Sequence, residues 1–167
     1  LRADANPSFP GMRNPEPIAG NLAGLSSYVV KNGFDVGLAL DGDADRLGVL
    51  DSEGRYLTTL QVFALLAYYF LEVRGLRGTI VKSVTAGDMP RKLGELFGVE
   101  VLETGVGFKY IAPLMLQHDA LIGGEESGGY AFRRHIPERD GILSGLFILD
   151  LIVQTGKGIR QLLDTVY

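Results

Sequence analysis

Three aspartates alternate with small residues at Asp41, Asp43 and Asp45, and Arg46 follows them directly. Alternate residues of an extended chain point the same way, so this spacing can direct three carboxylates towards one point. A hard divalent cation offsets their mutual repulsion, because Mg²⁺ and Ca²⁺ take oxygen ligands. Arg46 carries a permanent positive charge that suits bidentate contact with a phosphate. The segment therefore predicts a metal site used in chemistry on a phosphorylated compound.

Two other interpretations apply to the same residues. A calcium-binding EF-hand also begins with alternating aspartates, but it needs glycine at its sixth position and glutamate at its twelfth. Arg46 and Ser52 hold those positions here, so this interpretation fails at both. A solvated acidic turn is the simpler alternative, because Asp and Gly are common turn residues. The apolar run 35–40 (DVGLAL), which ends at the aspartates, favours the metal site over the turn.

A second candidate segment is rich in glycine, 123–129 (GGEESGG), and follows the short apolar run 120–122. Ligands of open α/β sheets gather at the carboxyl ends of strands, where we expect this segment to lie. Glu125 and Ser127 supply an acceptor and a hydroxyl, which are the groups that recognise sugar hydroxyls. A flexible turn with solvated acids is equally compatible with this segment alone.

Two further segments place charge near a helix start. Gly105 and Gly107 precede an expected helix, whose free N–H groups favour anions, and Lys109 adds positive charge there. The stretch 133–140 (RRHIPERD), which includes Arg139, is dense in charge. A solvated connection before a helix is the simpler interpretation of that stretch.

The pattern along the chain determines where these segments lie. We expect a helix over 22–32 with Asn21 as its cap, and further helices at 60–72, 88–97, 108–117, 142–154 and 159–166. We expect strands at 35–40, 47–50, 79–83, 99–102, 120–122 and 130–132. Strands separated by helices predict an α/β fold. Its main part is a three-layer α/β/α unit with a mainly parallel mixed sheet, preceded by a partial α/β domain.

Composition narrows the class of protein. The chain is 46% hydrophobic and 22% charged, and its net charge of −4 with no long basic run argues against a nucleic-acid partner. It contains no cysteine, which excludes disulfides and thiolate metal sites. The longest apolar stretch, 142–153, is interrupted by Asp150 and falls short of the ~20 residues of a membrane span. No signal-peptide pattern is visible, and we expect a soluble, cytoplasmic protein without a membrane partner.

Together these segments resemble the α-D-phosphohexomutase superfamily, the phosphoglucomutases and phosphomannomutases. The family's metal loop, D-G-D-x-D-R, is matched by residues 41–46, and its sugar-recognition loop, G-E-x-S-G, by residues 124–128. Residues 14–17 (NPEP) are similar to an N-P-x-P segment upstream of the metal loop. Residues 135–141 (HIPERDG) are similar to the H-I-R-E-K-D-G stretch of phosphoglucomutases. The matches follow the family order along nearly the whole chain.

The resemblance implies a role for each segment. It implies that the carboxylates of Asp41, Asp43 and Asp45 bind Mg²⁺. It also implies that Arg46 helps to hold the reacting phosphate region. It implies that Glu125 and Ser127 bind the sugar hydroxyls. It also implies that Gly107 and Lys109 line the same side of the cleft.

Two positions depart from the family pattern. The lysine of H-I-R-E-K-D-G, a proposed proton-transfer residue, is Arg139 here, and arginine is a poor general base. The histidine that often ends the sugar loop of phosphomannomutase relatives is Gly129. The resemblance therefore places Arg139 in the catalytic region without identifying the general acid or base.

Members of this family have four domains, and the resemblance implies that residues 1–54 are the C-terminal part of domain 2 and residues 55–167 are domain 3. The chain begins at Leu1 in a proline-rich stretch, which we interpret as a fragment of a longer protein. The sequence contains no Ser-His pair of the kind found in the family's phosphoserine segment, and no fourth-domain phosphate loop. We therefore expect an inactive fragment whose partners are a hexose phosphate and the missing domains 1 and 4.

The function implied by the resemblance is Mg²⁺-dependent interconversion of hexose 1-phosphate and hexose 6-phosphate, through a phosphoserine and a bisphosphorylated sugar. Glu126 together with Gly129 favours glucose, with mannose as the other possibility. The alternative is a non-catalytic module that binds Mg²⁺ or a sugar phosphate. An aspartate-nucleophile phosphatase is a weaker candidate, because such enzymes typically follow D-x-D with Thr or Val, where this chain has Ala44 and Asp45.

Overall fold

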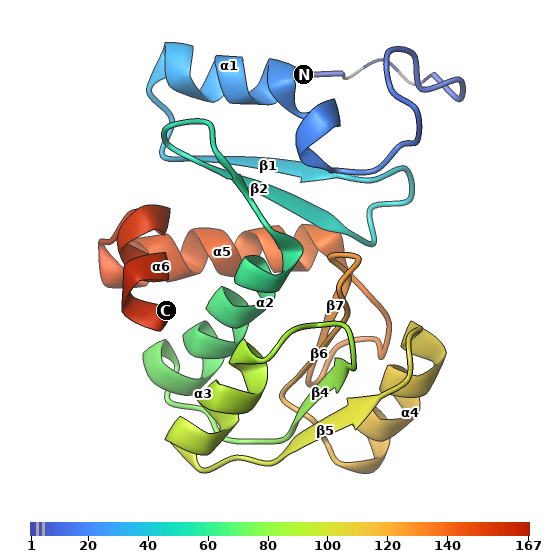
Figure 1. Ribbon diagram of the computed structural model, residues 1–167, viewed down its shortest axis with the longest axis vertical. Helices are drawn as coiled ribbons and strands as arrows, with labels where there is room; N and C mark the ends of the chain where they lie inside the picture. The colour runs from blue at the N-terminus through green and yellow to red at the C-terminus, as the bar shows by residue number, and fades with distance from the viewer. Residues whose placement is uncertain (3, 5) are drawn as a thin grey trace.

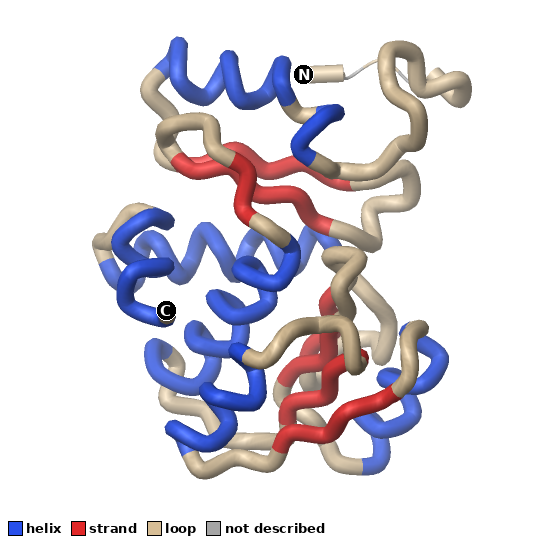
Figure 2. The backbone as a smooth tube through the Cα atoms, viewed as in Figure 1, coloured by secondary structure: helices blue, strands red, loops and turns tan. Residues whose placement is uncertain are grey.

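The structure is a computed structural model that describes residues 1–2, 4 and 6–167. Its elements are arranged around two sheets (Figures 1 and 2). The first sheet is antiparallel, in the order β1 (Val36–Leu40), β2 (Leu47–Asp51) and β3 (Tyr56–Leu57). The second has the order β5 (Val101–Thr104), β4 (Ile80–Ser83), β6 (Ile122–Gly124) and β7 (Tyr130–Phe132). There β4 is parallel to both β5 and β6, and only β7 is antiparallel to its neighbour.

Helices cover the sheets and connect their strands. In chain order they are η1 (Ala19–Asn21), α1 (Ala23–Asn32), α2 (Thr59–Tyr68) with its π-helical continuation η2 (Tyr69–Val73), α3 (Met89–Phe97), α4 (Phe108–Gln117), α5 (Gly141–Thr155) and α6 (Ile159–Val166). The mainly parallel second sheet, its helices and the preceding smaller sheet confirm the predicted α/β fold class.

The second sheet is the middle of three layers because successive side chains of a strand point to opposite faces. Ile80 and Ile122 belong to the large core that the sheet shares with α2, α3, α5 and α6. Val81, the residue after Ile80 in β4, instead packs with Phe108 and Ile111 of α4 in a smaller core on the other face. Both faces are therefore buried, as the near-continuous apolar strands of a parallel sheet require.

The first sheet lies between α1 and α5 (Figure 1). A Cβ at Gly37 would lie 2.8 Å from Val29 of α1, whereas the next residue, Leu38, reaches to within 3.3 Å of a Cβ placed at Gly145 of α5. Alternate residues of β1 thus pack against different helices. Because α5 also contacts β7 and η2, this one helix connects the two sheets.

The predicted cap of the first helix is wrong. The N-cap residue of α1 is Leu22, which makes no side-chain capping bond. The Asn21 side chain instead donates to the backbone carbonyls of Asn14 (2.9 Å) and Glu16 (2.8 Å). Asn21 therefore connects the proline-rich segment to η1, while the predicted helix end is confirmed by the left-handed Gly33.

Two strands lie about two residues later than predicted. We expected 99–102 and 120–122, and the ladders run over Val101–Thr104 and Ile122–Gly124. The apolar residues of each run mark where the chain enters the core, whereas the hydrogen-bonded ladder continues beyond them towards the loop. The shift moves polar and glycine residues into the carboxyl ends of the strands.

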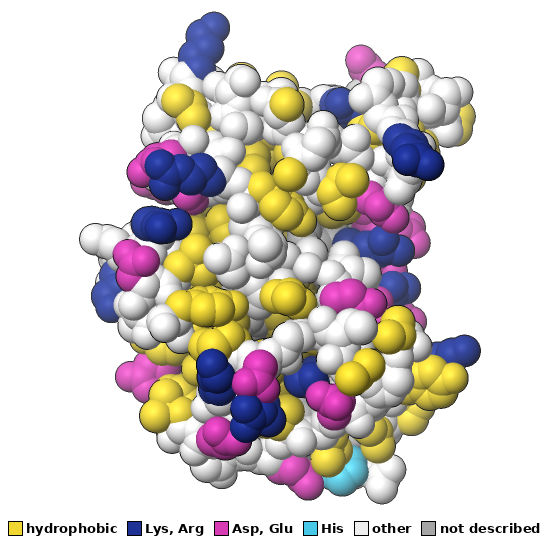
Figure 3. All heavy atoms as spheres, in the orientation of Figure 1, with side chains coloured by type: hydrophobic (Ala, Val, Ile, Leu, Met, Phe, Trp, Pro, Cys, Tyr) yellow, Lys and Arg dark blue, Asp and Glu magenta, His cyan; other side chains and the backbone are white. Residues whose placement is uncertain are grey.

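Acidic and basic side chains are interspersed over the face of the molecule seen in Figure 3. Within the described part of the chain, no single helix is long and apolar enough to cross a membrane. α5 and α6 pass that test only together, as a pair bent by 87°.

Candidate active site

The aspartate loop, residues 41–46, joins β1 to β2. One oxygen from each of Asp41, Asp43 and Asp45 lies within 4.8 Å of the other two. The convergence comes from a turn and not from an extended segment, since Ala44 has a positive φ of 63°. The Asp41 carboxylate also accepts a hydrogen bond from the backbone N–H of Arg46 (3.1 Å), which closes the turn.

Two arginines contact two of these three carboxylates, those of Asp41 and Asp45. Arg46 Nε lies 3.4 Å from Asp41 Oδ2 and 3.6 Å from Asp45 Oδ1, and this buried nitrogen makes no hydrogen bond within the described structure. Arg139 Nη2 lies 2.6 Å from the second oxygen of Asp45. Asp43 is exposed and takes part in no ion pair with a described residue. Negative charge in the loop therefore exceeds what its neighbours neutralise.

The excess of negative charge also affects the protonation of Asp45. The pKa of Asp45 is raised to about 6, mainly by burial and also by a hydrogen bond with Asp41 and the charges of Asp41 and Asp43, while the charge of Arg139 opposes this rise. A carboxylate that is costly to ionise, beside two others, is stabilised by an additional cation. The donor set consists only of carboxylate oxygens, which fits a hard divalent ion such as Mg²⁺.

The glycine loop, residues 123–129, lies at the carboxyl edge of the second sheet. Because β4, β5 and β6 are parallel, Ser83, Thr104 and Gly124 end their strands at the same edge. Glu126 connects two of these ends, since its carboxylate accepts hydrogen bonds from Ser83 (2.8 Å) and Thr85. Although burial raises the pKa of Glu126, these bonds and one from its own backbone hold that pKa below its ordinary range.

The Glu125 side chain makes different contacts from that of Glu126, and the residue is buried, with 6% exposure. Its Oε1 atom accepts from Ser127 Oγ (2.8 Å) and from Arg139 Nη1 (3.0 Å). Its Oε2 atom accepts no hydrogen bond from the described residues and is absent from the buried unpaired atoms among them. One oxygen of Glu125 is therefore oriented by protein contacts while the other is free to accept a hydrogen bond from a ligand hydroxyl.

The glycines of this loop have two different roles. A Cβ at Gly123 would lie 2.4 Å from Met115, and one at Gly124 would lie 2.9 Å from both Phe63 and Tyr130. These two glycines therefore allow close packing in the core. Gly128 has a φ of 93°, which a residue with a side chain rarely adopts, so it shapes the turn itself.

The aspartate loop and the glycine loop meet, although about eighty residues separate them. The N–H of Leu47 donates to the carbonyl of Gly128 (3.1 Å), and Arg46 and Gly129 form an antiparallel bridge. Arg139 then joins the side chains, because its guanidinium contacts both Asp45 and Glu125. The predicted metal and sugar segments thus occupy adjacent parts of one surface.

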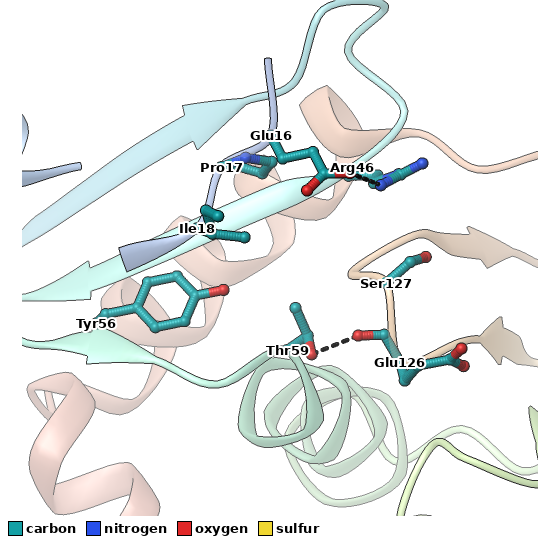
Figure 4. Close-up of a pocket in the computed structure, with 8 residues that line it drawn as sticks. All are labelled: Glu16, Pro17, Ile18, Arg46, Tyr56, Thr59, Glu126 and Ser127. Atoms are coloured by element: carbon teal, nitrogen blue, oxygen red, sulfur yellow. Dashed lines mark hydrogen bonds and ion pairs between the residues drawn. The ribbon is translucent and has the colours of Figure 1, made fainter. Parts of the chain in front are cut away.

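A cavity of about 330 Å³ opens beside this junction (Figure 4). Arg46 and Ser127 lie on one side and Tyr56 on the other, and the Thr59 hydroxyl donates to the Glu126 carbonyl below them in this view (2.6 Å). The lining is completed by Glu16, Pro17 and Ile18. This volume is at the lower end of the range for small-molecule sites.

The remaining predicted residues lie nearby but are less constrained. Gly107 precedes α4 with a φ of 118°, and Lys109 is exposed with its Nζ 5.0 Å from the Tyr110 ring centre. Neither is bonded to the two loops, so the structure brings them only to the same edge of the sheet. Phe108, between them, touches the site through Arg139, whose Cζ lies 5.7 Å from its ring centre.

Sequence reasoning missed two charged residues. Glu16 pairs with Arg46 (3.3 Å), and its N-P-x-P context was the available signal. Lys82 is 3% exposed at the end of β4 and pairs with Glu103 (2.6 Å). A lysine inside the apolar run 79–83 was a detectable exception, since lysine is almost never buried without a partner.

Comparison with known families gives two adjoining matches. Residues 59–167 match the model for phosphoglucomutase/phosphomannomutase, alpha/beta/alpha domain III, and residues 1–54 match the model for domain II of the same family. A phosphoglucomutase/phosphomannomutase from Thermococcus kodakarensis is 34% identical over 98% of this chain, which covers 36% of that relative. A phosphoglucosamine mutase from Streptomyces coelicolor is 36% identical over 83% of this chain, which covers 31% of that relative. The chain thus spans about a third of the length of these relatives.

Solved structures agree with these matches. A Thermus thermophilus protein described as a phosphomannomutase has a TM-score of 0.87 at 40% identity, over 92% of this chain and 35% of its own. An N-acetylphosphoglucosamine mutase from Aspergillus fumigatus, in complex with GlcNAc-6P and magnesium, has a TM-score of 0.65 over 84% of this chain and 36% of its own. At 16% identity, that second likeness is one of fold.

Proposed function

Because this chain belongs to the phosphoglucomutase/phosphomannomutase family, we propose that it is the part of a Mg²⁺-dependent phosphohexomutase that holds the metal and the sugar. In this proposal residues 1–54 are the C-terminal part of domain 2 and residues 55–167 are domain 3. The whole enzyme interconverts hexose 1-phosphate and hexose 6-phosphate through a phosphoserine and a bisphosphorylated sugar. Domains 1 and 4 supply the serine and the phosphate loop.

The observation that carries this proposal is the position of Arg139. Its guanidinium lies 2.6 Å from Asp45 in the aspartate loop and 3.0 Å from Glu125 in the glycine loop. If the two loops bound unrelated ligands, their functions would not require one side chain that contacts both. Their junction supports a single site in which metal and sugar are held together.

The aspartate loop serves the reacting phosphate. Phosphoryl transfer depends mainly on positioning and on neutralising the charge of the phosphoryl oxygens. Mg²⁺ held by Asp41, Asp43 and Asp45 supplies that neutralisation when bound. Arg46 adds a fixed positive group beside it, and its ion pair with Glu16 (3.3 Å) orients the guanidinium.

The glycine loop serves the sugar. The free oxygen of Glu125 accepts a hydrogen bond from a hexose hydroxyl, and so does the Ser127 hydroxyl oxygen, whose own proton is donated to Glu125. Gly107 and Lys109 line the same edge. Because the hexose must bind in two orientations, the loop should contact hydroxyls and leave the reacting phosphate to the aspartate loop. Glu126, held by Ser83 and Thr85, fixes the loop on β4. We favour glucose as the sugar, with mannose as the alternative.

A coupled assay tests this function. The polypeptide encoded by the complete reading frame is incubated with Mg²⁺ and either glucose 1-phosphate or mannose 1-phosphate, and formation of the 6-phosphate is followed. We expect turnover of glucose 1-phosphate at least as fast as that of mannose 1-phosphate, and no turnover by residues 1–167 alone. Absence of turnover by the complete polypeptide with either substrate would contradict the proposal. Binding of Mg²⁺ and sugar phosphate without turnover would favour a non-catalytic module.

A further inference from the structure

Arg139 is held by three segments that are distant in sequence. Its two terminal nitrogens bond different carboxylates, Nη2 to Asp45 and Nη1 to Glu125, and its guanidinium lies over the Phe108 ring at the start of α4. The side chain is only 24% exposed. A guanidinium does not lose its proton at physiological pH, so these contacts indicate a positional role and not proton transfer.

Gly129 provides the space for this side chain. A Cβ at residue 129 would lie 2.3 Å from Arg139 Cδ and 2.8 Å from its Cγ, distances that the middle of a side chain cannot tolerate. The backbone of Gly129 is outside the left-handed region, so its conformation does not require glycine. The stem of Arg139 is therefore the physical reason for the missing side chain.

We infer that Arg139 is a positioning residue that links the aspartate loop to the glycine loop. Its side chain fits between them because Gly129 has no side chain. The inference rests on the proposed function in taking Asp45 as a metal ligand and Glu125 as a sugar ligand. The contact between Arg139 and Asp45 also has an electrostatic consequence, because a fixed positive charge beside Asp45 opposes the approach of a second cation. Arg139 thus stabilises the empty loop and lowers its affinity for a divalent ion.

This role predicts that loss of Arg139 changes the stability of the fold and the affinity for Mg²⁺ in opposite directions. Replacing Arg139 by Ala removes the ion pairs, so the fold becomes less stable, but it also removes the competing charge, so Mg²⁺ binds more tightly. A residue with a merely structural role would loosen the loop and weaken Mg²⁺ binding together with stability. Arg139→Lys keeps the charge and should leave the affinity near that of the wild type.

Calorimetric titration of residues 1–167 with Mg²⁺ alone tests the charge effect. We expect Arg139→Ala to tighten Mg²⁺ binding by at least about threefold. Gly129→Ala should do the same by displacing the guanidinium, and the double variant should match Arg139→Ala. Controls are Arg91→Ala, which removes an exposed arginine on α3, and Gly20→Ala, where a Cβ meets nothing within 4 Å. Unchanged or weaker binding by Arg139→Ala would overturn the inference.

Urea unfolding without metal tests the steric link independently. Each single variant should lower the midpoint, but Gly129→Ala should have little further effect in the Arg139→Ala background, where the nearest remaining atom is the Cβ, 3.4 Å away. Additive effects of the two changes would overturn the inference. If neither the wild type nor any variant binds Mg²⁺, the proposed metal site fails, and the unfolding cycle alone decides whether Gly129 and Arg139 are coupled.

Discussion

Neighbouring residues of identical type have different roles at this site, and Glu125 and Glu126 show why. Both carboxylates are held by hydrogen bonds, but those of Glu126 come from the end of β4, while those of Glu125 come from Ser127 and Arg139 within the site. Glu126 therefore fixes the loop in place. Glu125 keeps one oxygen for a ligand, which makes it the residue to test.

Glu125→Ala should chiefly weaken binding of hexose phosphate. The change removes the free acceptor and also releases Arg139 and Ser127 from their shared oxygen, so we expect a loss of about 1.5–3 kcal/mol in binding free energy. Calorimetry of the complete polypeptide with glucose 1-phosphate measures it. Glu95→Ala, an exposed change on α3, is the control. An affinity equal to that of the wild type would count against the sugar-binding role.

The sequence identified which residue types carry the chemistry, but not the pairs that they form. The aspartate spacing predicted convergence of the three carboxylates, and the structure achieves it through a turn at Ala44 that the spacing alone did not require. The pairing of Arg139 with Asp45 and Glu125 depends on how three segments meet. No local pattern contains that information.

At the scale of elements, helix ends marked by glycine were predictable, whereas the ends of β5 and β6 were not. Gly33 and Gly98 end their helices in the left-handed conformation, which only glycine adopts easily. Strand β6 runs into Gly124 because core side chains, Phe63 and Tyr130, occupy the place of its missing side chain. Glycine normally argues against a strand, so this boundary depends on tertiary packing.

The start of α5 is the element that positions the aspartate loop. The N–H of Gly141 donates to the carbonyl of Ala44 (2.9 Å), and Asp140 caps the helix by accepting from Leu143 (2.8 Å). A Cβ at Gly141 would lie 2.7 Å from the backbone oxygen of Arg46. The helix and the loop can approach this closely only because residue 141 has no side chain.

Gly141→Ala should therefore lower the free energy of unfolding by about 1–3 kcal/mol, because a backbone atom cannot move aside as a side chain can. Urea denaturation followed by circular dichroism measures the change. Gly145→Ala in the same helix is the matched control, since its Cβ would meet only the ends of two side chains, Leu38 at 3.3 Å and Leu47 at 3.6 Å. Equal losses in the two variants would show that close docking of the loop on α5 is not the cause.

At the scale of the whole molecule, α5 makes the two sheets one structure. It packs on β1 and β2 with one part of its surface and on β7 and η2 with another. The large core includes Leu47 and Val49 of the first sheet together with Ile80 and Ile122 of the second. A boundary between residues 54 and 55 therefore crosses a continuous core.

We expect this chain to unfold in one cooperative transition, because neither sheet has a core that is complete without α5. Urea unfolding should give coincident curves by far-ultraviolet circular dichroism and by tyrosine fluorescence. Hydrogen exchange should assign similar stabilities to the slowest amides of β2 and β4. Two separated transitions would contradict this prediction and would indicate that residues 1–54 are an independent unit.

We propose that the aspartate loop and the glycine loop form one phosphohexomutase site. The most direct test is the rate of glucose 1-phosphate conversion by the complete polypeptide carrying Asp43→Asn, at saturating Mg²⁺. Asp43 is the loop carboxylate without an ion-pair partner among the described residues, and Asp35→Asn, an exposed change at the other end of the 35–40 run, is the control. We predict a loss of about two or more orders of magnitude for Asp43→Asn only. A rate near that of the wild type would contradict the claim.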